Sequence, residues 1–127
     1  LYGPSNSAEK IRDLTGIQDF IALEIFYCVN NQITSLDLSK NIALVSLVCV
    51  ENSITSLNVS KNTALETLSC FNNELTSLDV SNITNLKTLF SYGNQLTCIK
   101  VNQNQMNNIP PYNWIKDAKA SYSASCN

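Results

Sequence analysis

The residues best suited to chemistry in this sequence are its five cysteines, because the chain contains no histidine. Cys28, Cys49 and Cys70 are evenly spaced along the chain, whereas Cys98 and Cys126 lie in its last third. A regular row of three thiols does not offer the tetrahedral set of four ligands that zinc requires. We therefore expect buried free thiols in this row, with a metal site as the alternative, and we expect neither a metal nor a cofactor.

Carboxylates are the other candidate catalytic groups. Glu24 and Glu66 lie two repeat lengths apart, which at about 4.8 Å per stacked strand would place them roughly 10 Å apart, with Val45 between them. Inverting glycosidases hold their carboxyl pair about 6.5 to 9.5 Å apart. An open curved surface also lacks the pocket that such chemistry uses, and no GxGxxG or GxxxxGK[ST] string occurs. We therefore expect that the protein is not an enzyme.

Composition limits the class of protein and its partners. The 127 residues are 44% apolar with a net charge of −2, which fits one globular domain. The eight basic and ten acidic residues are scattered singly and give no footprint for nucleic acid. No apolar run approaches the roughly 18 residues of a membrane span, and LYGPSNSAEK lacks the features of a signal peptide. We expect no nucleic-acid partner, no transmembrane segment in this chain, and any export signal or anchor outside it.

A 21-residue repeat decides the predicted fold. Four segments that begin at Leu23, Leu44, Leu65 and Leu86 align without a gap. Their spacing fits the leucine-rich repeat, in which a short strand lines the inner curve of a horseshoe. The sequence therefore predicts an α/β-type repeat solenoid: a right-handed leucine-rich repeat coil with a short parallel concave sheet and a mostly irregular convex side. The recurring apolar columns are Leu23, Leu44, Leu65, Leu86; Phe26, Leu47, Leu68, Leu89; Ile33, Ile54, Leu75, Leu96; Leu36, Leu57, Leu78, Ile99; and Leu38, Val59, Val80, Val101.

Two further columns form a predicted structural ladder. An inward asparagine amide at the turn that leaves each strand can bond backbone groups of its own and neighbouring coils. The cysteines of the regular row take an apolar position of the strand and pack inward beside these amides. The ladder consists of Asn31, Asn52, Asn73, Asn94, Cys28, Cys49 and Cys70.

The repeat weakens at both ends of the chain. Ile11, Leu14 and Ile17 keep nearly the repeat spacing, so residues 1–22 are predicted to hold an N-terminal segment and a degenerate first coil. The four repeats occupy residues 23–103. Residues 104–127 are predicted to form a C-terminal cap, with Trp114 as its lid, because the last coil would otherwise expose its leucines.

The sequence resembles bacterial secreted and cell-surface leucine-rich repeat proteins with 21-residue repeats, distantly internalin-like. The LTSLDVS-like return segments and the Leu-x-x-Leu-x-Cys-x-x-Asn strands carry this resemblance, together with an ending that contains Trp114, Asp117, Tyr122, Ser123 and Cys126. Such domains bind proteins or glycans outside the cell, so the resemblance implies a secreted or cell-surface location, or the periplasm. It does not specify a ligand.

The resemblance also concerns the remaining cysteines and the last coil. Caps of this group are closed by a bridge at the positions of Cys98 and Cys126, which implies a disulfide there. Such a bridge would stabilise the fold by roughly 3 to 4 kcal/mol and would indicate an oxidising compartment. Ser91 and Gly93 depart from the pattern of the other coils, so we expect a local alteration near the cap.

A concave stripe is the candidate binding surface. Side chains between the strand leucines alternate onto the concave face, because strand side chains have a period of two. Two of these outward columns are largely apolar, and a polar rim surrounds them; this composition is typical of a protein interface or a sugar-stacking platform. The predicted ligand-binding residues are Tyr27, Val29, Val48, Val50, Phe71, Phe90 and Tyr92.

The predicted function is a non-catalytic binding module that recognises a protein or a glycan through the concave stripe. The alternative is a structural or spacer module of a larger surface protein, in which the stripe packs against adjoining domains or against a second copy as a homodimer.

Overall fold

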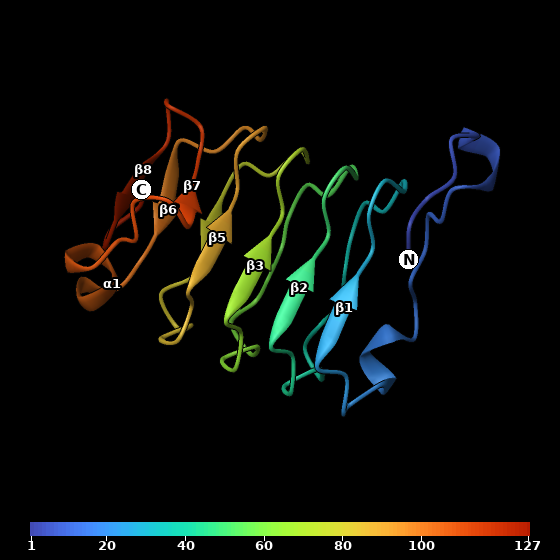
Figure 1. Ribbon diagram of the computed structural model, residues 1–127, viewed down its shortest axis with the longest axis horizontal. Coiled ribbons are helices and arrows are strands. Elements are labelled where there is room, and N and C mark those ends of the chain that lie inside the picture. Colours follow the sequence, from blue (N-terminus) through green and yellow to red (C-terminus); the bar gives the residue numbers. More distant parts are fainter.

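The computed structural model describes the backbone from Leu1 to Asn127 and every side chain except that of Ser7. The chain winds into coils that stack side by side, so their strands follow one another along the long axis of the molecule (Figure 1). The first sheet is parallel and has five strands in the order β1-β2-β3-β5-β7. These strands are β1 (Ile25–Tyr27), β2 (Ser46–Val48), β3 (Thr67–Ser69), β5 (Thr88–Phe90) and β7 (Trp114–Ile115). The predicted parallel-sheet solenoid is confirmed.

The register of this sheet follows the sequence repeat. Phe26 pairs with Leu47, Leu47 with Leu68, and Leu68 with Leu89, so residues one repeat length apart stack directly on one another. Leu47, Leu68 and Leu89 are fully buried. Burial of a leucine contributes about 1.5 to 3 kcal/mol, and the columns join these contributions into one core that no single coil could form.

A second parallel sheet lies on the opposite side of the last coils. It consists of β4 (Leu78–Asp79), β6 (Cys98–Lys100) and β8 (Ser121–Ser123), in that order. The sequence predicts a mostly irregular convex side, which holds for the first coils, but the C-terminal coils are more regular. The difference arises because the cap contributes β8, which gives β6 a strand partner on each side. The helical elements are short: η1 (Ser7–Glu9), η2 (Ile17–Asp19) and α1 (Gln103–Asn107).

The inward asparagines connect successive coils through both ends of their amides. In Asn73, Oδ1 accepts a hydrogen bond from the backbone N–H of Ile54 at 3.0 Å, while Nδ2 donates to the carbonyl oxygens of Cys49 at 2.9 Å and Cys70 at 3.1 Å. One side chain thus satisfies three backbone groups on two coils. The same pattern of bonds recurs at Asn31, Asn52 and Asn94.

A second amide column lies at the opposite corner of the coils. Asn62 Nδ2 donates to the carbonyl oxygens of Leu38 and Asn41 at 3.0 and 2.9 Å, and Asn41 bonds the preceding coil in the same way. Ile83 takes the equivalent position one repeat after Asn62, and it interrupts the column. Gln105 resumes it from helix α1 by donating to the carbonyl oxygen of Ile83 at 2.9 Å.

The N-terminal segment extends the sheet by one isolated parallel bridge. Tyr2 forms a parallel bridge with Val29, and the N–H of Gly3 donates to the carbonyl oxygen of Val29 at 2.7 Å. The N–H of Ile11 bonds Oδ1 of Asn31, as Ile33 bonds Asn52 in the next coil. The segment therefore stacks as a degenerate coil against the first repeat.

The cap closes the C-terminal end through packing, a disulfide and a carboxylate. Trp114 is 6% exposed and pairs in register with Leu89, so its ring covers the last leucines. Cys98 and Cys126 form a disulfide with 5.8 Å between their Cα atoms. The loop it closes is long enough for the bridge to stabilise the fold by roughly 3.5 kcal/mol in the chain-entropy account.

Replacing Asn73 with alanine is expected to destabilise the protein by about 3 kcal/mol, because the N–H of Ile54 and two buried carbonyl oxygens lose their partner. Urea unfolding followed by circular dichroism measures this change. Asn85→Ala, at an exposed turn, is the matched control and should change the free energy of unfolding by less than about 0.5 kcal/mol. Equal effects of the two substitutions would refute the structural role of the ladder.

Candidate binding face

The outward side of the five-stranded sheet, called the sheet face below, carries the predicted stripe. Its central row follows the strand register through Tyr27, Val48, Ser69 and Phe90 and continues to Ile115. Tyr27 and Ile115 are 39% and 42% exposed at the two ends of the row. Val48 and Phe90 are half-buried, and Ser69 is buried. The row is therefore an apolar surface with its most accessible side chains at the ends.

The second row contains Val29, Val50, Phe71 and Tyr92, and its exposure is lowest at Val50 and highest at Tyr92. Val50 is only 5% exposed, so the expectation that this row is exposed throughout is wrong at Val50. The row lies two residues beyond the ends of the strands, where the chain turns away from the sheet. Val29 is half-buried, and the N-terminal strand pairs with its backbone.

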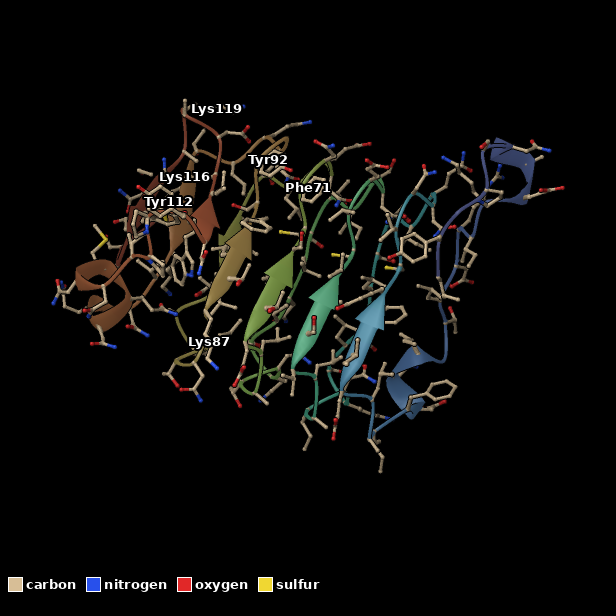
Figure 2. All side chains as sticks on the ribbon, in the orientation of Figure 1. Phe71, Lys87, Tyr92, Tyr112, Lys116 and Lys119 are labelled. Atoms are coloured by element: carbon tan, nitrogen blue, oxygen red, sulfur yellow. A yellow bond between two sulfur atoms is a disulfide. The ribbon has the colours of Figure 1, made fainter. Side chains whose placement is uncertain are left out.

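Phe71 and Tyr92 form a stacked aromatic pair. Their ring centroids are 4.6 Å apart and the ring planes differ by 7°, which matches the spacing of adjacent strands. Tyr92 is 36% exposed and Phe71 is half-buried. Figure 2 shows the two rings at the same end of β3 and β5. The pair is a rigid platform, since each ring limits the rotation of the other.

A residue with left-handed backbone conformation follows each of the first four strands of this sheet by three positions. Asn30, Glu51 and Asn72 have φ values of 55°, 55° and 53°, and Gly93 continues this column with φ 66°. We expected a local alteration of the last coil near Gly93, but the backbone conformation at Gly93 matches that of the other coils, so this expectation is wrong for the backbone dihedral angle. Glycine fits there because a Cβ atom would lie 2.1 Å from Oδ1 of Asn72.

The last coil differs from the others in the group that accepts hydrogen bonds from its backbone N–H groups after the strand. The N–H groups of Gly93 and Asn94 donate to Oδ1 and Oδ2 of Asp117 at 2.9 and 3.0 Å. In the preceding coil, the N–H of Asn72 instead donates to the carbonyl oxygen of Tyr92 at 3.0 Å. A carboxylate of the cap thus replaces the coil that would come next.

The charged rim contains an ion pair between adjacent coils. Glu66 Oε2 lies 2.8 Å from Lys87 Nζ, and the two side chains are 44% and 68% exposed. This ion pair engages one of the two carboxylates considered for glycosidase chemistry, and Val45 lies in the column between Glu66 and Glu24. An exposed pair of this kind contributes little stability.

The cysteine row is buried and chemically inert. Cys28, Cys49 and Cys70 are fully buried free thiols. Burial raises the pKa of Cys28 to about 11 and that of Cys70 to about 12. Burial also raises the pKa of Cys49 well above its ordinary value, with a further contribution from the thiols on either side. The thiolate is the reactive form, so these cysteines are poor nucleophiles.

No group of three or more histidine, cysteine, aspartate or glutamate side chains is placed to hold a metal ion among the residues that the structure describes. Among the same residues, no helix has the length and apolar character needed to cross a bilayer.

Two solved structures that are similar to this chain are internalins. The functional domain of InlJ from Listeria monocytogenes, described as including a cysteine ladder, superposes with a TM-score of 0.68 and 41% identity over 73% of this chain. The internalin InlF from the same species superposes with a TM-score of 0.63 and 24% identity over 93% of this chain, which shows the fold alone. The chain is an internalin-like leucine-rich repeat solenoid.

The internalin-like chain is much shorter than these neighbours. It spans 21% of the InlJ chain and 39% of the InlF chain. No protein-family model matches it, and a search of curated proteins finds no match either. The resemblance to bacterial internalin-like proteins that the sequence predicts is confirmed at the level of fold and repeat.

Three features of the internalin-like fold were not anticipated from the sequence. The second amide column could have been found from the Lys-Asn pairs that end at Asn41 and Asn62, one repeat length apart. The placement of Ile115 on the sheet face had no such signal, because helix α1 makes the step from Phe90 to Ile115 longer than one repeat. Asp117 belonged to the recognised ending, but its bonds to the last coil depend on the folded cap.

The number of thiols that react with iodoacetamide tests both the buried row and the bridge. We expect no modification of the native protein at about pH 8, because the thiolate population of buried cysteines is low. Unfolding without a reductant should expose three thiols, and unfolding with a reductant should expose all five. Intact-mass spectrometry counts the adducts. Five adducts without reductant would contradict the disulfide, and adducts in the native state would contradict the burial.

Proposed function

We propose that this solenoid is a non-catalytic binding module that recognises a protein or a glycan through the sheet face. The internalin-like fold suggests a protein-binding module in general. The observation that carries the finer proposal is the stacked pair of Phe71 and Tyr92, which presents partly exposed aromatic surface beside an apolar row. Aromatic side chains of this kind dominate binding energy at interfaces.

Rigidity favours binding by this surface. The backbone of the sheet face is fixed by strand pairing and by the asparagine amides behind it. The ring stack then orders Phe71 and Tyr92 before any partner arrives. Binding therefore requires little further loss of side-chain entropy, which is a principal cost of association.

The proposed module is displayed in an oxidising compartment, on the cell surface or as a secreted protein, with the periplasm as a further option. The Cys98–Cys126 disulfide supports this location, because such bridges persist outside the reducing cytosol. The likeness to Listeria internalins supports the same location and a non-enzymatic role.

Self-association is the second candidate function, and the N-terminal end of the solenoid favours it. Phe20, Ile21, Ile25 and Ile42 are between 60% and 66% exposed and lie on the first coils. Ile42 follows Ile21 at the repeat distance, so the two stack on adjacent coils. An apolar group of this size on a soluble domain indicates a surface that is covered by another copy, an adjoining domain or a partner.

Phe71→Ala combined with Tyr92→Ala tests the binding proposal. The variant should lose about tenfold or more in affinity for any protein or glycan that the wild type binds, because the aromatic platform is removed. The measurement is light scattering at several concentrations, followed by titration against a panel of purified extracellular proteins and a glycan array. Tyr92→Ala alone guards against a folding defect, since Phe71 is the more buried ring.

Phe20→Ala combined with Ile21→Ala is the matched control at the opposite end of the molecule. If the wild type is a dimer that dissociates in this control variant but not in the Phe71→Ala, Tyr92→Ala variant, self-association belongs to the N-terminal end and the sheet face is free. A dimer that dissociates only in the Phe71→Ala, Tyr92→Ala variant, with no ligand found, would contradict the binding proposal.

A further inference from the structure

We propose that the C-terminal end of the sheet face binds an acidic polypeptide segment of a partner protein. This terminal patch consists of Tyr92, Tyr112, Ile115, Lys116 and Lys119. Because Tyr92 and Ile115 of this patch belong to the sheet face, the inference rests on the proposed function, and it adds the charge and chemical class of the partner.

Backbone bonds between the last coil and the cap bring the patch together. The N–H of Ser91 donates to the carbonyl oxygen of Ile115 at 2.8 Å, and the N–H of Gly93 donates to Oδ1 of Asp117 at 2.9 Å. Phe90 pairs in register with Ile115, so Tyr92 and Lys116 lie within one position of each other on adjacent chain segments just beyond the paired strands. Figure 2 shows Tyr112 and Lys116 near each other at the C-terminal end of the molecule, on the side of β5 away from β3, with Lys119 at the tip of the cap above them.

Tyr112 is presented on a stiff turn. It is 86% exposed, the highest value among the large apolar and aromatic side chains described as exposed. Pro110 and Pro111 precede it with fixed φ angles, and the N–H of Trp114 closes the turn by donating to the carbonyl oxygen of Pro110 at 3.2 Å. Trp114 itself is buried in the cap. An exposed aromatic ring on such a support binds at low entropic cost.

The charge of the chain changes sign along the solenoid. Residues 1–85 contain four basic and nine acidic side chains, whereas residues 86–127 contain four basic and only one acidic side chain. The basic residues of the C-terminal part are Lys87, Lys100, Lys116 and Lys119. The basic end of an otherwise acidic protein complements a negatively charged partner.

The two lysines of the patch carry the available charge. Lys87 and Lys100 already form ion pairs, at 2.8 and 3.3 Å, and no such pair is recorded for Lys116 or Lys119 among the described side chains. The carboxylate of Asp117 lies between them in sequence, but both of its oxygens accept backbone N–H bonds. Lys116 Nζ donates to the carbonyl oxygen of Asp117 at 3.5 Å and lies over the Tyr122 ring, but neither contact neutralises its charge, so both ammonium groups are left to meet a carboxylate.

The composition of the patch favours a polypeptide over other polyanions. DNA-binding proteins neutralise many phosphates, commonly about six to ten, and two lysines cannot match such a row. Ile115 and the two tyrosines offer apolar contacts that fit the side chains of a peptide between its acidic residues. The expected segment therefore combines carboxylates with apolar or aromatic side chains.

The test is fluorescence anisotropy of this chain with a labelled peptide of about ten residues that alternates glutamate and leucine, beside a lysine–leucine peptide of equal length. The wild type should bind the acidic peptide in preference, and the affinity should fall as NaCl rises from about 0.05 to about 0.5 M. Lys116→Glu combined with Lys119→Glu should weaken binding about tenfold or more, and Tyr112→Ala should weaken it about threefold or more.

Lys40→Glu combined with Lys61→Glu is the matched control, since both lysines are exposed on earlier coils and the net charge changes equally. This control should change the affinity by less than about twofold. Because Lys116 Nζ lies 5.5 Å from the centre of the Tyr122 ring, Lys119→Glu alone keeps the test valid if the double variant disturbs the cap. Equal losses in the two double variants would overturn the proposal, and so would preferential binding of the lysine–leucine peptide.

Two further results separate this inference from the proposed function. Loss of peptide binding in the Phe71→Ala, Tyr92→Ala variant without loss in the lysine variant would overturn the acidic partner and leave recognition by the sheet face intact. Loss in neither variant would overturn both. Tighter binding to heparin or to vesicles of anionic phospholipid than to the acidic peptide would overturn the choice of a polypeptide.

Discussion

The amide of an inward asparagine is the interaction on which the rest of this solenoid depends. Each coil turns sharply after its strand and would leave backbone N–H and carbonyl groups buried without partners. The asparagine satisfies groups on its own coil and on the coil before it, as Asn73 does for Cys70, Cys49 and Ile54. The coils therefore stack at one height, and the leucine columns behind them become a continuous core.

A stack held together in this way must be closed at its ends. The C-terminal end is closed three times over, by the ring of Trp114, by the Cys98–Cys126 bridge and by the carboxylate of Asp117. The N-terminal end has a single bridge between Tyr2 and Val29, and Phe20 and Ile21 of the first coils remain exposed. The two ends thus differ in what they offer to other molecules, which explains why two surfaces compete as sites of association.

The same stacking decides which side chains are free for function. The core and the amide columns fix most positions of each coil, and only the outward strand residues and the turns can vary without cost to the fold. Those variable positions carry the aromatic pair of Phe71 and Tyr92 on the sheet face. In the cap, the positions not used for closure carry Tyr112 and two lysines, Lys116 and Lys119, that form no ion pair with a carboxylate among the described side chains.

The sequence by itself determined the solenoid, the inward columns and the cap, because a strict repeat period leaves only stacked coils able to bury its leucines. It also placed Phe71 and Tyr92 in one outward row. Only the tertiary structure decided that Val50 is buried, that Ile115 joins the sheet face and that Asp117 closes the last coil. The burial of Val50 depends on side-chain packing beyond the strand ends, and the positions of Ile115 and Asp117 depend on the extra residues that α1 adds before β7. The repeat period encodes neither.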